Sequence, residues 1–199
     1  MSESKAKVTC LNKQCTLSKE TELSPILTIP FEIESKELCV LLSYFLHRAP
    51  NVSSVHSSSL GTDVHKQVFE DMLLGRHFKY QKFCYSGAKI EDELFKGSLF
   101  GEKICLKCKR FVCKRVKTPK NKPPETDLDC FLRHLRNAIA HGRVYCQHAG
   151  SRVILVFEDE NPSGNLSARI VCIKADLQHW RKTLEKTRKS RGELTYGYH

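Results

Sequence analysis

The segment from residue 126 to residue 142 constrains the fold most, because it marks both ends of one helix. Thr126-Asp127-Leu128-Asp129 has the Ser/Thr-x-x-acid spacing of a capping box. At the other end, Gly142 favours the left-handed conformation in which many helices stop. At 100° per residue the apolar side chains form one stripe, made of Leu128, Phe131, Leu132, Leu135, Ala138 and Ile139. The sequence therefore predicts a helix that packs on a core along this stripe.

Polar residues of the same helix form a second pattern. Arg133, Asn137 and His141 recur at i, i+4 and i+8, which places them on the face away from the stripe, and Arg136 lies at the edge of that face. His141 falls in the last turn, where carbonyl dipoles favour a protonated imidazole that titrates near neutral pH. Guanidinium, amide and imidazole groups suit a phosphodiester site with general acid–base chemistry. Ordinary solvated polarity is the other interpretation.

The rest of the chain predicts a mainly α fold with four to five helices and one β-hairpin. Apolar residues recur at helical spacing in four further segments, and two short β-like runs flank a turn with Pro162 and Gly164. We expect helices over residues 35–50, 64–75, 88–100 and 175–189, and hairpin strands over 152–158 and 166–173. The hairpin thus lies between the polar-faced helix and the last helix.

The expected domain organisation is one helical domain with flanking segments. We expect an irregular N-terminal arm over residues 1–34, a helical domain over 35–190 and a C-terminal tail over 191–199. Within the domain, the proline-containing segment 117–125 is expected to be a flexible basic linker. No apolar run approaches the roughly 18 residues of a membrane span, and the first residues lack an apolar signal core. A cytoplasmic protein without membrane contact is therefore expected.

The charge favours a polyanionic partner. Lys and Arg number 33 against 22 Asp and Glu, a net charge of +11. Residues 101–122 alone hold nine basic residues and one acid. Contacts of Lys and Arg with phosphates release counterions, so this excess favours RNA binding, with a solvated surface as the alternative. The candidate RNA-binding residues are Lys109, Arg110, Lys114, Arg115, Arg133 and Arg143.

Ten cysteines are present, and we expect them to be thiols in a reducing compartment. Cys105-x2-Cys108 has half the spacing of a zinc site, but the other half is not evident. If that segment is helical, Cys105 and Cys108 share a face and read as buried thiols. No cofactor is therefore expected, with zinc at Cys105 and Cys108 as the weaker alternative.

The sequence around His141 resembles a known family. Leu135-Arg136-Asn137-Ala138-Ile139-Ala140-His141-Gly142 is similar to the Arg-x4–6-His signature of the HEPN superfamily, in which a polar residue such as Asn137 follows the Arg. The resemblance covers residues 126–186, and the hairpin with its Trp-containing last helix looks like a plasmid- and phage-associated branch. It implies a HEPN-like helical bundle that forms a homodimer with the two motif helices face to face.

The resemblance also implies an activity, a metal-independent endoribonuclease that acts as a toxin or abortive-infection effector. An RNA 2′-hydroxyl would attack the adjacent phosphorus, with His141 transferring protons, Arg136 binding the phosphate and Asn137 orienting the pair. The implied partners are RNA, a second copy and an antitoxin or other regulator. Arg143 stands where one toxin branch has the Tyr that an adenylylating antitoxin modifies, which argues against that partner. The alternative is a non-catalytic RNA-binding or regulatory HEPN module, zinc-stabilised through Cys105 and Cys108.

Overall fold

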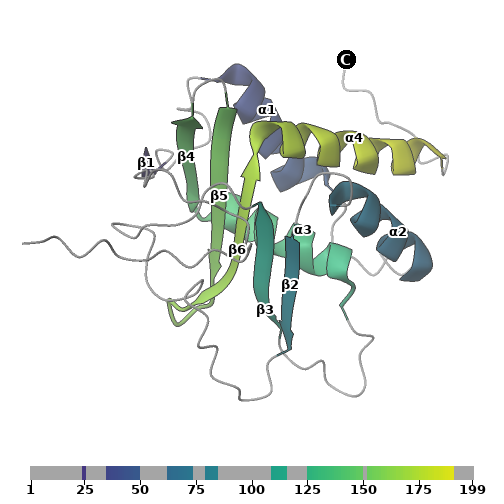
Figure 1. Cartoon of the computed structure of the whole chain (residues 1–199), viewed down its shortest axis with the longest axis horizontal. Helices are drawn as coiled ribbons and strands as arrows, with labels where there is room; N and C mark the ends of the chain where they lie inside the picture. Colours follow the sequence, from purple (N-terminus) through teal and green to yellow (C-terminus); the bar gives the residue numbers. More distant parts are fainter. Residues whose placement is uncertain are drawn as a thin grey trace, which may run out of the picture.

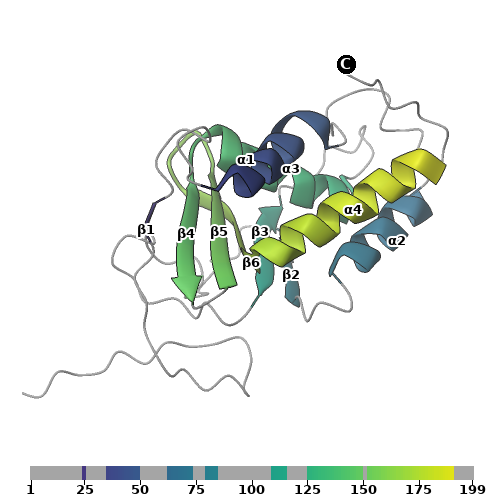
Figure 2. The ribbon, with the colours of Figure 1, turned by 90° about the horizontal axis from the view of Figure 1, so that it is seen from above.

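The computed structural model describes residues 24–25, 35–49, 62–73, 79–84, 109–115, 125–149 and 152–190. They form a group of helices packed against one face of a sheet (Figures 1 and 2). The helices are α1 (Lys36–Ser43), the π-helical η2 (Tyr44–Arg48), α2 (Thr62–Leu73), α3 (Asp127–Ala140) and α4 (Lys174–Ser190). The strands are β1 (Ser24–Pro25), β2 (Lys79–Cys84), β3 (Arg110–Arg115), β4 (Val144–Ala149), β5 (Arg152–Glu160) and β6 (Leu166–Ile173).

The sheet is built around the predicted hairpin, which is confirmed as β5 and β6. Its turn is closed by a hydrogen bond from Asn161 N–H to Asn165 O (2.9 Å), and Gly164 adopts a φ of 77° that favours glycine. The strand order is β1-β4-β5-β6-β3-β2, and neighbours run antiparallel except for the parallel pair β2 and β3. Phe157 lies opposite both Ile170 and Val144, so these three residues share the helix-covered face.

The predicted mainly α class is corrected by the structure, because it omits most of the sheet. The described part of the chain is a mixed α/β fold in which helices predominate, because β4 and β3 extend the hairpin on both sides. Both added strands have six residues, a length over which periodicity is weak, and β3 pairs with the distant β6. The predicted helix over 88–100 and most of the basic linker over 117–125 lie outside the described residues.

The predicted helix over 35–50 is confirmed as α1 followed by η2. Ser35 caps its start, where the side-chain oxygen accepts from Leu38 N–H (3.3 Å). In η2 the hydrogen bonds widen, and Ala49 N–H reaches back to Tyr44 O (2.9 Å). Ala49 itself is extended, with ψ of 146°, as expected for the residue before a proline.

Helix α3 begins and ends as its sequence predicts. Thr126 is the N-cap, and its hydroxyl oxygen accepts from Asp129 N–H (3.2 Å). His141 is the C-cap, and Gly142 follows with a φ of 66°. The predicted apolar stripe is buried throughout.

Aromatic side chains join α3 to the other helices and to the sheet. Phe131 of α3 makes edge-to-face contacts with Phe111 of β3 and Trp180 of α4, with ring centroids 5.1 and 4.9 Å apart. Trp180 is fully buried, and its indole N–H donates to Met72 O at the end of α2 (3.0 Å). The core therefore lies between the sheet and the helices, with α3 inside it.

Helix α3 also has a second buried face, toward the sheet. Cys130 Sγ lies 3.7 Å from Cys113 Sγ of β3, and both His134 and Asn137 contact Asp159 of β5. These residues lie about 180–240° round the helix from Leu128, on the side that the sequence predicts to face away from the core. That prediction is wrong for Asn137, because α3 is packed between two layers.

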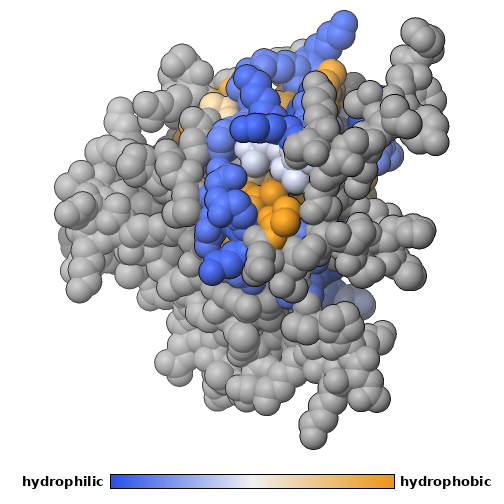
Figure 3. All heavy atoms as spheres, turned by 90° about the vertical axis from the view of Figure 1, so that its right-hand side faces the viewer, coloured by the Kyte–Doolittle hydropathy of each residue, from blue (hydrophilic) through white to orange (hydrophobic). Residues whose placement is uncertain are grey.

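The surface of the described residues is largely polar. Among them, Val40 on α1 is the exposed large hydrophobic residue. The side of the molecule in Figure 3 shows hydrophilic residues around a small apolar patch. Within the described segments, no helix is long and apolar enough to cross a membrane.

Candidate active site

His141 stands in solvent at the carbonyl end of α3. Its backbone N–H bonds to Asn137 O (2.9 Å), and the next two N–H groups, of Gly142 and Arg143, bond to Ile139 O and Ala138 O. These bonds tighten the end of the helix, while the residue itself is exposed. The imidazole is thus held on an ordered backbone and is accessible to a ligand.

Arg136 lies on another side of α3, against the end of η2. Its Nη2 donates to the carbonyl oxygen of Ala49 (3.0 Å), and the residue is half-buried. Burial lowers the pKa of Arg136 below its ordinary value, but a guanidinium remains charged at neutral pH. The structure therefore fixes a positive charge between α3 and the residue that follows Arg48.

A groove with several basic residues is lined in part by Arg48, the residue before Ala49. It has a volume of about 540 Å³ and runs between α1, η2 and α4. Four of its lining residues are basic or can become so, namely Lys36, His47, Arg48 and Arg181. The guanidinium of Arg181 also lies 5.3 Å from the ring centre of Tyr44, which lines the groove as well. Positive charge along a groove suits the phosphates of a nucleic-acid strand.

Asn137 is tied to the sheet by Asp159. Its Nδ2 donates to Asp159 Oδ2 (3.2 Å), the oxygen that also lies 2.6 Å from His134 Nδ1. Burial opposes ionisation of Asp159, but its hydrogen bond and ion pair with His134 hold its pKa below the ordinary value. Asp159 is therefore a buried carboxylate that orients two polar side chains of α3.

Arg133 is engaged by an acid just before the helix. Its Nε and Nη2 donate to the two carboxylate oxygens of Glu125 at 2.6 and 2.9 Å. This bidentate bond raises the pKa of Arg133 further above its ordinary value. RNA binding by Arg133 stays a prediction. An RNA phosphate would have to compete with Glu125 for this guanidinium.

The remaining predicted RNA-binding residues are spread over the sheet. Lys109 Nζ donates to the buried Asp176 at the start of α4 (3.0 Å), and Arg143 pairs with Glu160. Arg110, Lys114 and Arg115 lie on β3, and their side chains fall outside the described residues. Cys105 and Cys108 also lie outside them. Lys109, Arg133 and Arg143, the predicted RNA-binding residues whose side chains are described, therefore each pair with a carboxylate.

A comparison with family models decides the family. The model described as HEPN pEK499 p136 matches residues 23–190, which is most of the chain. The chain belongs to this HEPN family. HEPN domains are commonly ribonucleases of defence and toxin systems. No curated protein and no solved structure matched.

The match places α3, with Arg136 and His141, inside the HEPN domain. The match also begins close to β1, whose Ser24 and Pro25 pair with Cys146 and Tyr145 of β4. The domain thus includes a strand from the segment in which the sequence suggests an irregular arm.

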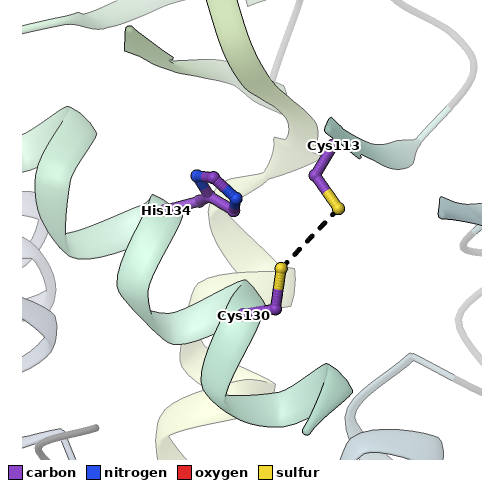
Figure 4. Close-up of side chains that lie close together, drawn as sticks. All are labelled: Cys113, Cys130 and His134. Carbon is purple, nitrogen blue, oxygen red and sulfur yellow. Dashed lines mark hydrogen bonds between the residues drawn. The ribbon is translucent and has the colours of Figure 1, made fainter. Parts of the chain in front are cut away.

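A cluster inside the HEPN domain was missed by the sequence analysis. Cys113 of β3 meets Cys130 and His134 of α3, and one ligand-type atom from each lies within 4.8 Å of the others (Figure 4). Cys113 and Cys130 are 0% exposed and His134 is 2% exposed. The available signal was Cys130-x3-His134, since a spacing of four residues places two side chains on one helix face.

Contacts within the cluster and with Asp159 shift the pKa values of Cys130 and His134. The hydrogen bond with Cys113 lowers the pKa of Cys130 to about 5, against the opposing effect of burial. Burial opposes protonation of His134, but hydrogen bonds with Asp159 and Cys130 raise its pKa above the ordinary value. A thiolate beside an imidazole ring is therefore favoured in a site without solvent contact.

Proposed function

We propose that this HEPN domain is an endoribonuclease that cuts RNA by attack of a 2′-hydroxyl on the adjacent phosphorus. His141 transfers the protons, Arg136 binds the phosphate and Asn137 orients the reacting groups. The products are a 2′,3′-cyclic phosphate and a 5′-hydroxyl, and no metal ion takes part in the reaction. The biological role that fits is that of a toxin or defence effector, held in check by a regulator.

The observation that carries the proposal is the exposed imidazole of His141 on a fixed helix end. A general acid or base must reach the proton it moves, and an exposed side chain on an ordered backbone meets this requirement. Arg136 supplies a fixed charge on the same helix and bonds to Ala49, the residue after Arg48, which lines a groove with further positive charge. An accessible proton donor and a cationic groove favour phosphodiester chemistry over a purely structural role.

The proposal includes a second copy of the chain. Arg136 bonds to the end of η2, whereas His141 stands at the end of α3. A homodimer that brings two α3 ends together would let the groups of one copy supplement those of the other. Size-exclusion chromatography with light scattering tests for the dimer directly.

The deciding experiment combines point variants with mapped RNA ends. Pure protein is incubated with total RNA and tRNA, in buffer with EDTA, and the new ends are analysed for cyclic phosphate. His141→Ala and Arg136→Ala should each reduce cleavage by at least 100-fold, a typical contribution of such groups. Lys66→Ala is the control, because Lys66 is exposed on α2, outside the proposed site, and should cleave normally.

The substrate offers a second control. A matched RNA with a single 2′-deoxynucleotide at the cut site should bind and resist cleavage, because the attacking hydroxyl is gone. Wild-type activity in the His141→Ala variant, or cutting of the deoxy substrate, contradicts the mechanism. Binding of RNA without any cleavage would instead favour the non-catalytic alternative.

A further inference from the structure

We propose that Cys113, Cys130 and His134 bind a Zn²⁺ ion that joins β3 to α3. The ion takes no part in the proposed cleavage chemistry, although Asp159 contacts both His134 and Asn137. The site differs from the pair Cys105 and Cys108 suggested by the sequence. Two of the ligands come from one helix at i and i+4, and the third comes from the facing strand.

The first argument is the distance between the sulfurs. Zinc bonds cysteine sulfur at about 2.3 Å, and two such bonds at the tetrahedral angle place the sulfurs about 3.8 Å apart. Cys113 Sγ and Cys130 Sγ are 3.7 Å apart. The sulfurs therefore need no rearrangement of β3 or α3 to share an ion.

The second argument is the orientation of the imidazole. His134 Nδ1 is hydrogen-bonded to Asp159 Oδ2 (2.6 Å), so Nε2 is the ligand atom. Nε2 now lies 3.3 Å from Arg133 Nη2, and the ion would displace that contact. A metal-binding histidine almost always has its other nitrogen bonded to a carboxylate, a carbonyl or water in this way. Asp159 is itself fixed by the amide of Asn137 (3.2 Å). The arrangement thus contains the supporting carboxylate as well as the ligand.

The third argument is charge. Two thiolates balance the two charges of Zn²⁺, so the ion adds no net charge to this buried site. The guanidinium of Arg133, whose Nη2 lies 3.3 Å from His134 Nε2 and 3.9 Å from Cys130 Sγ, is neutralised by Glu125. Thiolate and imidazole ligands select zinc over Mg²⁺ or Ca²⁺.

The ion would connect the sheet to the helix that carries Arg136 and His141. Cys130 and His134 lie six and two residues before Arg136, so the ion would hold α3 against β3 within about two turns of Arg136. Its role is therefore structural. Loss of the metal should lower the stability of the domain whether or not RNA cleavage is found.

The first test is the metal content of the full chain. Protein purified under reducing conditions without chelator should contain about one zinc per chain, as measured by inductively coupled plasma mass spectrometry. Cys113→Ser, Cys130→Ser and His134→Gln should each lose most of it. Cys172→Ser is the matched control, because Cys172 is equally buried on β6 but outside the cluster, and should keep its zinc.

A second test does not depend on the folding of variants. Co²⁺ exchanged into the wild-type chain should give the visible bands of a tetrahedral ion and thiolate-to-metal charge transfer. X-ray absorption of the zinc form should show two sulfurs at about 2.3 Å and nitrogen at about 2.0–2.1 Å.

Three results would overturn the proposal. The first is wild-type protein without stoichiometric zinc and without cobalt bands. The second is full zinc content in the Cys113→Ser and Cys130→Ser variants, which would place the ion elsewhere. The third is a disulfide between Cys113 and Cys130 in the freshly purified chain. None of these depends on RNA cleavage, so failure of the nuclease proposal leaves the test intact.

Discussion

Asp159 connects two polar residues of α3 to the sheet, and this makes Asn137 important for stability. Asn137→Ala removes a hydrogen bond to a carboxylate and should lower the free energy of unfolding by roughly 1.5–3 kcal/mol. Asn137→Asp should lower it further, because two carboxylates would then face each other near a buried position. Urea denaturation of both variants measures the difference. Equal stability of the two would contradict the contact with Asp159.

Glu158 should make stability depend on pH. Burial raises the pKa of Glu158 above 4.5, although Arg169 opposes this, and Glu160, Arg143 and Tyr145 lie around it. From pH 4.5 up to the raised pKa, the folded chain keeps a proton that the unfolded chain has lost. Stability therefore falls as pH rises through this window.

The check compares Glu158→Gln with wild type. Urea titrations at several pH values between 4 and 7 should show that the wild type loses stability relative to the variant as pH rises. The charge of Arg169, 2.6 Å from Glu158, limits the size of the effect. An opposite trend, with the wild type gaining on the variant, would show that the ion pair outweighs burial.

At the residue scale, the sequence predicted which groups are polar but not which partners they have. Arg133, Asn137 and His141 lie at neighbouring angles on α3, and all three would face solvent only if the helix had one buried face. Glu125 binds Arg133, and Asp159, 22 residues after Asn137, binds Asn137. Because Asp159 lies on a strand of the sheet, the periodicity of the helix sequence gives no sign of this contact. The exposed end at His141 was predictable because Gly142 marks it.

At the scale of single elements, the start of α3 depends on Thr126. Its hydroxyl accepts from Asp129 N–H and contacts His65 of α2 (3.0 Å). Thr126→Ala should cost about 1 kcal/mol of unfolding free energy, a typical value for a lost N-cap. Thr126→Ser keeps the hydroxyl and should recover most of this. Thermal and urea denaturation measure both, and an unchanged Thr126→Ala variant would contradict the capping role.

Elements with local signals were predicted well, and those with distant partners were not. Helix α3 has its cap, stripe and stop within 17 residues, and the hairpin has its turn between its strands. Strand β3 instead pairs with β6 and with β2, and those pairings depend on the folded chain rather than on neighbouring residues. Cys113 could not be placed beside Cys130 for the same reason.

At the scale of the whole molecule, we expect the positive net charge to favour RNA binding along the groove between α1, η2 and α4. Each phosphate contact contributes about 0.7 to the slope of log affinity against log salt for a single strand. Lys36→Ala and Arg48→Ala should each reduce that slope by about this amount and weaken RNA binding at low salt. Fluorescence anisotropy with a labelled RNA measures the slope. Lys66→Ala on α2 serves as the control and should leave it unchanged.

Because α3 has packed layers on both sides, it cannot roll or tilt without separating one of them from its neighbours. The direction of the groups at its ends is therefore decided when the chain folds, before any ligand arrives. The entropic cost of orienting these groups is then part of folding rather than of ligand binding. A ligand at this helix end would have to adapt its own shape to a rigid template.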